Sequence, residues 1–185
     1  MSKLSALAVL AMLALPGAAS AATITNEYVF HQYDPSEVRA MTQGQDFRVV
    51  VIGNPTTASQ SAFEARLMQL LQHDLQGLQT HPTTTPIASN NWGYRLVLMF
   101  NTDSGELGRT LCGDLAGVKT FPATGGGEMK VSAALCRGKD PMSAAFARSD
   151  GASLEDASAG QMFSELTSVL FPNRPGLLIN RNIPF

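Results

Sequence analysis

The chain carries two apolar runs, FRVVVI at residues 47–52 and YRLVLMF at residues 94–100, on either side of a helical pattern. Turn residues close both runs, and valine and aromatic residues are frequent in them, which is typical of well-buried strands. Apolar residues between the runs recur at helical spacing: Phe63, Leu67, Leu70, Leu71, Leu75 and Leu78. A helix between two apolar strands predicts a β–α–β crossover, with 47–52 as a central strand.

Local signals predict where this helix and a second, later helix begin and end. Thr57 and Gln60 match a capping box ahead of the first helix, and Gly77 suits a left-handed terminating residue. Ser158 and Gln161 match a second capping box. The apolar residues that follow it form one stripe, which ends before a proline: Met162, Phe163, Leu166, Val169 and Leu170.

Five further segments complete the expected order of elements. We expect an edge strand within residues 23–33, a turn or a brief helical piece over 36–41 and a loop over 80–91. Residues 129–137 and 143–148 predict an antiparallel hairpin, with helix as the alternative because both segments contain several alanines. The apolar stripes are buried best in an α+β fold, a two-layer sandwich in which a mixed sheet of about four or five strands has two helices on one face.

The first 21 residues predict export. Lys3 precedes an uncharged run of about a dozen residues, and Ala19-Ser20-Ala21 fits the small-x-small pattern of a signal peptidase site. We expect cleavage after Ala21, with Ala22 as the alternative, and a single domain over residues 22–185. The destination is then a bacterial periplasm or the medium outside the cell.

Composition excludes several classes of protein. Of 185 residues, 44% are hydrophobic and 15% are charged, and the formal net charge is −2. A disordered chain has fewer apolar residues, and a nucleic-acid-binding surface has a strong excess of positive charge. No stretch approaches the roughly 20 apolar residues of a membrane span. We therefore expect no nucleic-acid partner and no integral membrane span in the mature chain.

The two cysteines, Cys112 and Cys136, predict a disulfide, because an exported chain enters an oxidising compartment. They do not form a Cys-x-x-Cys redox pair, and none of the three histidines stands at ligand spacing to a cysteine. Metal binding through the cysteines is the weaker alternative, and we expect no metal site and no cofactor.

Motifs for catalysis are incomplete. The turn at residues 53–57 has no serine where a hydrolase nucleophile would stand, and the glycines of 125–127 lack the Gly-Lys-Ser/Thr ending of a phosphate loop. His31 and Asp34 fall on opposite faces of a strand, and His73-Asp74 lies at a polar helix border. We predict no catalytic residues. Possible binding residues flank the loops at each side of the crossover: Asn54, Thr56, Trp92, Tyr94 and Arg95.

The order of elements resembles the small α+β domain at the N-terminus of the periplasmic translocation protein TolB and in outer-membrane assembly proteins of the CsgG type. Five segments are similar to a group of uncharacterised exported proteobacterial proteins, over about a quarter of the mature chain: FRVVVIGNPT (47–56), GYRLVLMFN (93–101), LCG (111–113), ALCRG (134–138) and ELTSVLFP (165–172). The resemblance implies an exported α+β domain and carries no activity.

Three functions follow as hypotheses. The first is a non-catalytic envelope protein that binds another envelope protein or contributes to an assembly. The second is a module for a small solute or peptide, which requires a pocket between residues 53–57 and the region of Trp92. The third is a hydrolase, which requires His31 or His73 within hydrogen-bond reach of a carboxylate and a nucleophile.

Overall fold

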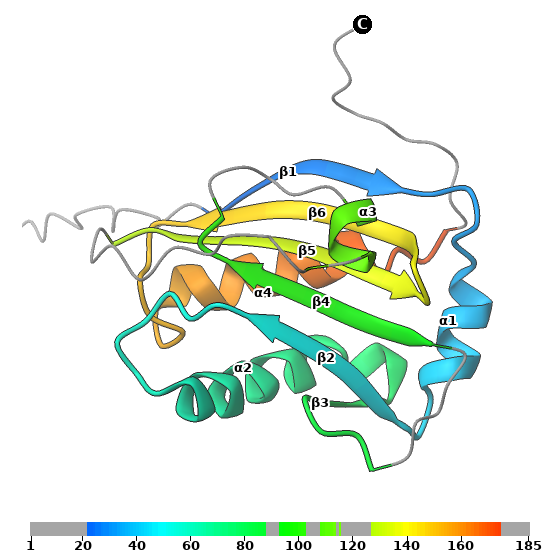
Figure 1. Cartoon of the computed structure of the whole chain (residues 1–185), viewed down its shortest axis with the longest axis horizontal. Coiled ribbons are helices and arrows are strands. Elements are labelled where there is room, and N and C mark those ends of the chain that lie inside the picture. The colour runs from blue at the N-terminus through cyan, green and yellow to red at the C-terminus, as the bar shows by residue number, and fades with distance from the viewer. Residues whose placement is uncertain (1–21, 88–92, 103–107, 114, 116–126, 175–185) are drawn as a thin grey trace, which may run out of the picture.

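The fold is a mixed six-stranded sheet with two long helices on one face, as the computed structural model in Figure 1 shows. The structure describes residues 22–87, 93–102, 108–113, 115 and 127–174. The predicted signal peptide, Trp92, the glycines of 125–126 and the tail after Arg174 lie outside the described residues.

The elements follow one another as β1 (Ala22–Val29), α1 (Pro35–Thr42), β2 (Asp46–Ile52), α2 (Gln60–Asp74), a 3₁₀ turn (Gln76–Leu78), β3 (His81–Thr83), β4 (Tyr94–Phe100), α3 (Gly108–Cys112), β5 (Met129–Arg137), β6 (Asp140–Ser149) and α4 (Ala157–Leu170). The strand order is β1-β6-β5-β4-β2-β3. The pairs β2–β4 and β2–β3 are parallel and the others antiparallel. The predicted α+β class is confirmed, with more strands than expected.

The β–α–β crossover is confirmed, but the central strand is β4 and not β2. Part of the segment expected to be a loop forms β3, which pairs with β2 and occupies the edge. Leu96 to Phe100 of β4 are fully buried, whereas Arg48 of β2 is exposed and Val50 to Ile52 are only half-buried. The difference arises because β4 lies between two long strands, while β2 has only three residues of β3 on its other side.

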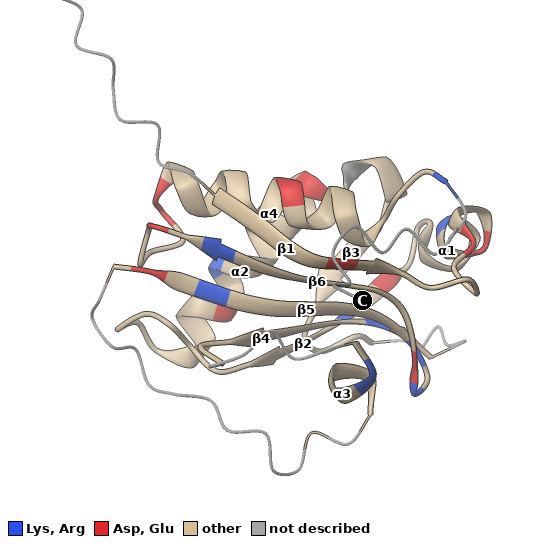
Figure 2. Cartoon of the chain, turned by 90° about the horizontal axis from the view of Figure 1, so that it is seen from above, with Lys and Arg blue, Asp and Glu red and all other residues tan. Residues whose placement is uncertain are grey.

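Helices α2 and α4 form one core with the sheet. Their stripes bury Phe63, Leu67 and Leu71 from α2 and Met162, Phe163, Leu166 and Leu170 from α4. The ring of Phe63 meets that of Phe100 edge to face, with centroids 5.0 Å apart. Figure 2 shows α4 on one side of the sheet and α3 on the other. The two predicted helices therefore form one layer and bury the apolar stripes that the sequence indicated.

The starts of both helices differ from the capping-box predictions. Ser59 and not Thr57 caps α2, because the Ser59 side chain accepts a hydrogen bond from the backbone amide of Ala62. Helix α4 begins after Asp156, and Ser158 lies buried inside it, where its hydroxyl meets that of Ser149 at 3.1 Å. A serine that bonds across to the sheet is not available to cap its own helix.

The end of α2 also differs from the prediction. Gly77 has no left-handed conformation: a 3₁₀ turn continues through Gln76–Leu78, and Gln79 carries the positive φ of 50°. Leu75 and Thr80 on either side of this turn are buried. Packing of these neighbours fixes the place of the reversal, so the glycine's conformational freedom is not used.

The hairpin and the edge strand are confirmed. Strands β5 and β6 pair antiparallel around Gly138, whose φ of 59° suits a tight turn, and β1 lies at the sheet edge. The register of β1 shifts between Thr25 and Tyr28, where Asn26 has a φ of 52°. Such a bulge interrupts the row of backbone groups that an edge strand presents to other chains.

The disulfide attaches α3 to the second face of the sheet. Cys112, the last residue of α3, bonds to Cys136 of β5, which confirms the predicted pair. A separate apolar cluster, which includes Val97, Met99 and Leu111, is buried there. We call this side the outer face. None of the helices within the described ranges has the length and apolar character needed to span a bilayer.

Removal of the disulfide should destabilise the fold. The cysteines are 24 residues apart, and a loop of that size stabilises the folded state by about 3 kcal/mol. We expect Cys112→Ser, Cys136→Ser and the double variant to lower the melting temperature alike, by roughly 6–12 °C in a calorimetric scan. A double variant much more stable than either single one would show that a lone thiol, and not the lost bond, causes the damage.

Charge placed on the inner side of either long helix should unfold the domain. Leu67 and Leu166 are almost completely buried, so Leu67→Asp or Leu166→Asp buries an unpaired carboxylate. We expect loss of the cooperative thermal transition measured by circular dichroism. Gln69→Asp and Ser164→Asp are the matched controls, because both residues are exposed on the same helices. Equal behaviour of test and control variants would contradict the helix faces.

Candidate functional site

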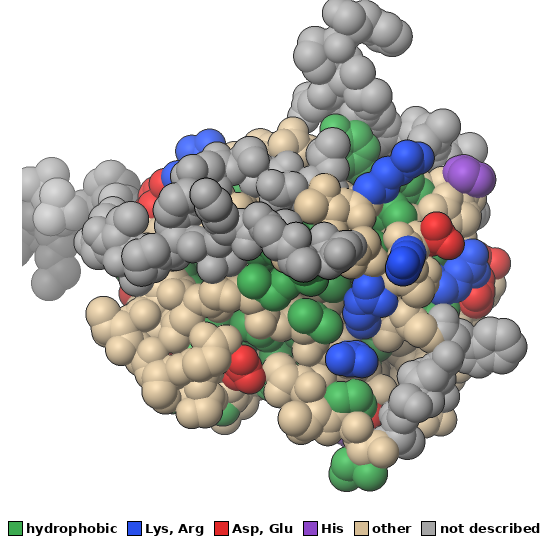
Figure 3. Space-filling view, in the orientation of Figure 1, with side chains coloured by type: hydrophobic (Ala, Val, Ile, Leu, Met, Phe, Trp, Pro, Cys, Tyr) green, Lys and Arg blue, Asp and Glu red, His purple; other side chains and the backbone are tan. Residues whose placement is uncertain are grey.

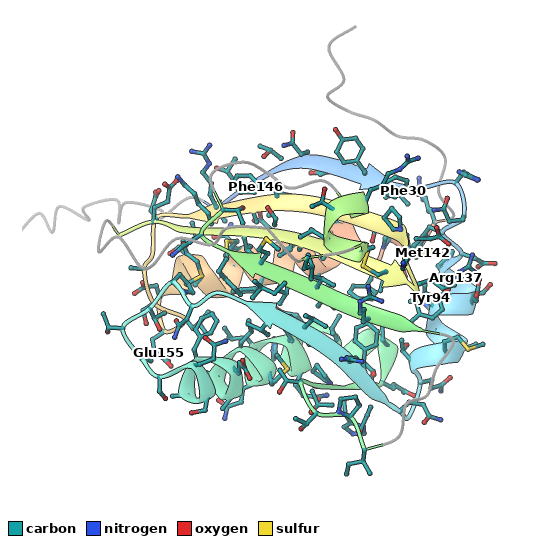
Figure 4. All side chains as sticks on the ribbon, in the orientation of Figure 1. Phe30, Tyr94, Arg137, Met142, Phe146 and Glu155 are labelled. Atoms are coloured by element: carbon teal, nitrogen blue, oxygen red, sulfur yellow. A yellow bond between two sulfur atoms is a disulfide. The ribbon has the colours of Figure 1, made fainter. Side chains whose placement is uncertain are left out.

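The structure separates the predicted binding residues into two groups. Asn54 and Thr56 follow the carboxyl end of β2, whereas Tyr94 and Arg95 begin β4. Because the strands are parallel, these positions lie at opposite ends of the sheet, roughly 20 Å apart along seven residues of strand. Figure 4 shows the same separation between Tyr94 and Glu155, a neighbour of the Thr56 loop. One pocket cannot include both groups.

Asn54 and Thr56 organise the loop between β2 and α2. The Asn54 Oδ1 accepts hydrogen bonds from the amide and the hydroxyl of Thr56, at 2.9 and 2.8 Å. Its Nδ2 donates to the carbonyl oxygen of Ala58 at 2.8 Å. Both ends of the amide are therefore used within the loop, as in a typical Asx turn. Asn54 therefore shapes the loop.

A cavity of about 560 Å³ lies beside this loop. The β2–α2 loop and the segment before α4 form its walls, mostly with apolar side chains such as Pro55, Phe63 and Leu154. At its rim Arg66 forms an ion pair with Glu155: its Nη2 donates a hydrogen bond to Oε2 at 2.9 Å, and its Nε lies 2.7 Å from Oε1. The volume falls within the range of roughly 300–1,000 Å³ usual for small-molecule sites.

Tyr94 belongs to the joint between α1 and the sheet. It is only 5% exposed and lies beside the ion pair of Glu37 on α1 with Arg137 on β5, whose N···O distance is 2.9 Å. Burial, reinforced by the Glu37 carboxylate, raises the pKa of Tyr94 to about 12. Figure 4 places Tyr94 next to Arg137. The phenol is thus a neutral, buried group beside the Glu37–Arg137 ion pair that joins α1 to the sheet.

Arg95, which was predicted together with Tyr94 as a possible binding residue, points to the outer face. Its Nη1 donates to the carbonyl oxygen of Gly138 at 2.7 Å and its Nη2 to that of Cys112 at 2.8 Å. Arg48 stands beside it, because the two residues are register partners on β2 and β4. Burial, together with the positive charge of Arg48, lowers the pKa of Arg95.

Two more cations extend this pair across the end of the sheet. Arg109 of α3 and Lys139 of the β5–β6 turn line a cavity of about 530 Å³, together with His31. We call Arg48, Arg95, Arg109 and Lys139 the basic band. In Figure 3 positive side chains gather on one half of the outer face, beside an apolar area. Half-buried Val50 and Ile52 extend from the band along β2.

No ion pair joins the basic band to a carboxylate within the described ranges. The ion pairs of the described residues all involve cations outside the band, and no described carboxylate lies within 4.0 Å of a band cation. At the other end of the outer face Lys130 and Arg148 share Glu128, at 3.0 and 3.4 Å. Like charges on directly paired strand positions destabilise a sheet. Among the described residues, no carboxylate forms an ion pair that offsets the repulsion between Arg48 and Arg95.

The histidines form one contact of the kind that catalysis uses. His73 Nδ1 lies 3.3 Å from Asp74 Oδ1, and burial raises the pKa of that carboxyl. Ser164 lines the same cavity of about 490 Å³, but no hydrogen bond joins it to His73 in the described part of the chain. The His73 side chain is 81% exposed. This site therefore has a histidine–carboxylate pair, but no described nucleophilic side chain is hydrogen-bonded to the histidine.

The other motif residues have structural roles. Asp34 caps α1, because its Oδ1 accepts a hydrogen bond from the amide of Ser36 at 2.8 Å. His31 is exposed and lies apart from that carboxylate, at the cavity of Arg109. Among the residues that the structure describes, no group of three or more His, Cys, Asp or Glu side chains is placed to hold a metal ion.

Sequence reasoning found only one member of the basic band, Arg95. Arg48, Arg109 and Lys139 stand far from it along the chain and in no motif. The pairing of β2 with β4, the hairpin turn and the disulfide bring them together. The only sequence signal for these cations was Arg48, the one charged residue in the apolar run of residues 47–52.

Comparison with known proteins gives no family for this chain. No protein-family model, no curated protein and no solved structure matches it. The resemblance to the TolB and CsgG type of domain therefore stays a prediction. The function has to be argued from the geometry and charge of the described residues.

Proposed function

We propose that this chain is an exported, non-catalytic module that binds another envelope protein through the basic band. The periplasm is the compartment that fits best. The signal-peptide pattern of residues 1–21 supports export, and so does the Cys112–Cys136 disulfide, because such bonds persist in oxidising compartments.

The observation that carries the proposal is the pair of Arg48 and Arg95, for which the described residues supply no ion-pair partner. The Arg95 guanidinium is fixed by two carbonyl oxygens, which do not neutralise its charge. A binding partner with negative charge relieves the repulsion and gains orientation from the fixed guanidinium. Apolar side chains of Val50 and Ile52 next to the band offer surface that a partner can bury.

The geometry gives catalysis less support. The His73–Asp74 pair is on the helix layer, away from the outer face, and Ser164 is not bonded to it. A hydrolase requires a nucleophile held by its base and donors for the oxyanion. The binding proposal requires only the charges and surfaces already described.

Photocrosslinking in intact cells tests the proposal. A benzophenone side chain at position 50, on the outer face, should give a discrete protein adduct, whereas the same group at position 69, on exposed α2, should not. We expect Arg48→Glu to abolish the adduct because it reverses one charge of the band. Adducts would be read by immunoblot and mass spectrometry.

Arg148→Glu is the matched control, because it makes the same charge change at the other end of the outer face. An adduct that survives Arg48→Glu, or one that forms equally from positions 50 and 69, would refute binding through this surface. Loss of the adduct in both charge variants would indicate a general effect of net charge.

The cavity of about 560 Å³ favours a second candidate function, the binding of a small apolar solute or peptide side chain. Its walls are mainly apolar, and Arg66 with Glu155 supplies polar atoms at the rim, which is the usual construction of such sites. This site would include Thr56, but not Tyr94 or Arg95.

An apolar fluorescent probe, anilinonaphthalene sulfonate, tests the second candidate. Probe fluorescence should rise with the native chain, and Ala62→Trp should remove the increase because Ala62 lines the cavity. Ala65→Trp is the control, because Ala65 is exposed on the same helix outside the cavity. If both variants bind the probe as the natural chain does, this cavity is not the site.

A further inference from the structure

We infer that the basic band accepts an extended acidic segment of a protein, in which several Asp or Glu side chains meet the four cations in turn. The inference rests on the proposed function and adds the chemistry of the partner.

The shape of the band fits a strand-like segment. Its cations come from β2, β4, the β5–β6 turn and α3, which covers β5 and β6. The band thus crosses about three strand spacings, roughly 14 Å, and an extended segment of about five residues covers that length. Carboxylates at alternate positions of such a segment lie on one side and meet successive cations.

The hydrogen bonds that orient Arg95 make the binding of a compact phosphate group less favourable. A phosphate is bound best by a guanidinium fork that donates two parallel hydrogen bonds. Each terminal nitrogen of Arg95 already donates one of its two hydrogens, Nη1 to the carbonyl oxygen of Gly138 and Nη2 to that of Cys112, and these bonds fix the orientation of the guanidinium fork. Arg95 therefore acts as a fixed positive charge, and charges spread along a row match separate carboxylates better than one dense anion.

At the opposite end of the outer face, positive side chains are paired with a carboxylate of the same chain. There Glu128 lies between Lys130 and Arg148 and supplies the negative charge within the chain itself. The basic band has no such residue in the described ranges, and Asp140 is the one carboxylate among the residues that line its cavity. An acidic partner would play the part at this end that Glu128 plays at the other.

Titration calorimetry with an oligoglutamate peptide tests the inference. A blocked peptide of about eight glutamates is long enough to span the band. We expect it to bind the disulfide-intact mature chain at low salt, with an affinity that falls as salt rises. Arg48→Glu and Lys139→Glu should each weaken binding by about tenfold or more. Arg148→Glu should change the affinity by less than about twofold, since it lies outside the band.

The variants are chosen to keep the fold. Arg48 and Lys139 are exposed, and their side chains make no hydrogen bond in the described part of the chain, so Lys139→Glu should leave the melting temperature unchanged. Arg48→Glu should not lower it, because the change removes the repulsion between Arg48 and Arg95. Arg95→Lys is an additional variant: it keeps the charge but alters the bonds to Gly138 and Cys112. We expect it to retain most of the affinity, because the inference assigns Arg95 a role as charge.

Several results would overturn the inference. These are no binding of oligoglutamate at low salt, equal weakening by Arg148→Glu, or stronger and equally variant-sensitive binding of inorganic phosphate, phosphatidylglycerol vesicles or single-stranded DNA. If oligoglutamate fails while the position-50 adduct still depends on Arg48, the proposed function stands and only the acidic chemistry is wrong. If the peptide binds as expected but no adduct forms, the acidic specificity stands without the envelope partner.

Discussion

The parallel pairing of β2 with β4 places Arg48 against Arg95 and Ile52 against Met99. This register determines which side chains share the outer face, because paired residues point to the same side of a sheet. It also places the loop that follows β2 and the first residues of β4 at opposite ends of the sheet. The basic band and the Thr56 cavity are thus two separate sites, one at each end of the same strand pair.

The disulfide connects this register to the short helix above it. Helix α3 has only five residues, too few for a stable helix in isolation, so its position depends on Cys112–Cys136 and on packing against the sheet. Arg95 donates to the Cys112 carbonyl oxygen, so the bond that stabilises the fold also holds the orientation of a charge. Stability and the proposed binding surface therefore share one structural element.

Hydrophobic patterns predicted most of the elements. The buried stripes of α2 and α4, the run of β4 and the hairpin of β5 with β6 lie where the sequence indicated. Predictions failed where a local signal competed with tertiary contacts. Ser158 forms a hydrogen bond with Ser149 across the core and does not cap α4. Ser59, and not Thr57, caps α2. Strand β3, with three residues and a proline, is too short to give a periodic signal.

The order of residues along the chain was sufficient for the α+β class, for the faces of the long helices and for the cysteine pair, because those features depend on nearby spacing or on the chemistry of the residue itself. The site required the folded molecule. Arg48, Arg95, Arg109 and Lys139 are separated by dozens of residues or belong to different elements, and strand order, register and the disulfide bring them together. Such contacts arise from packing across the whole sheet, and no local pattern encodes them.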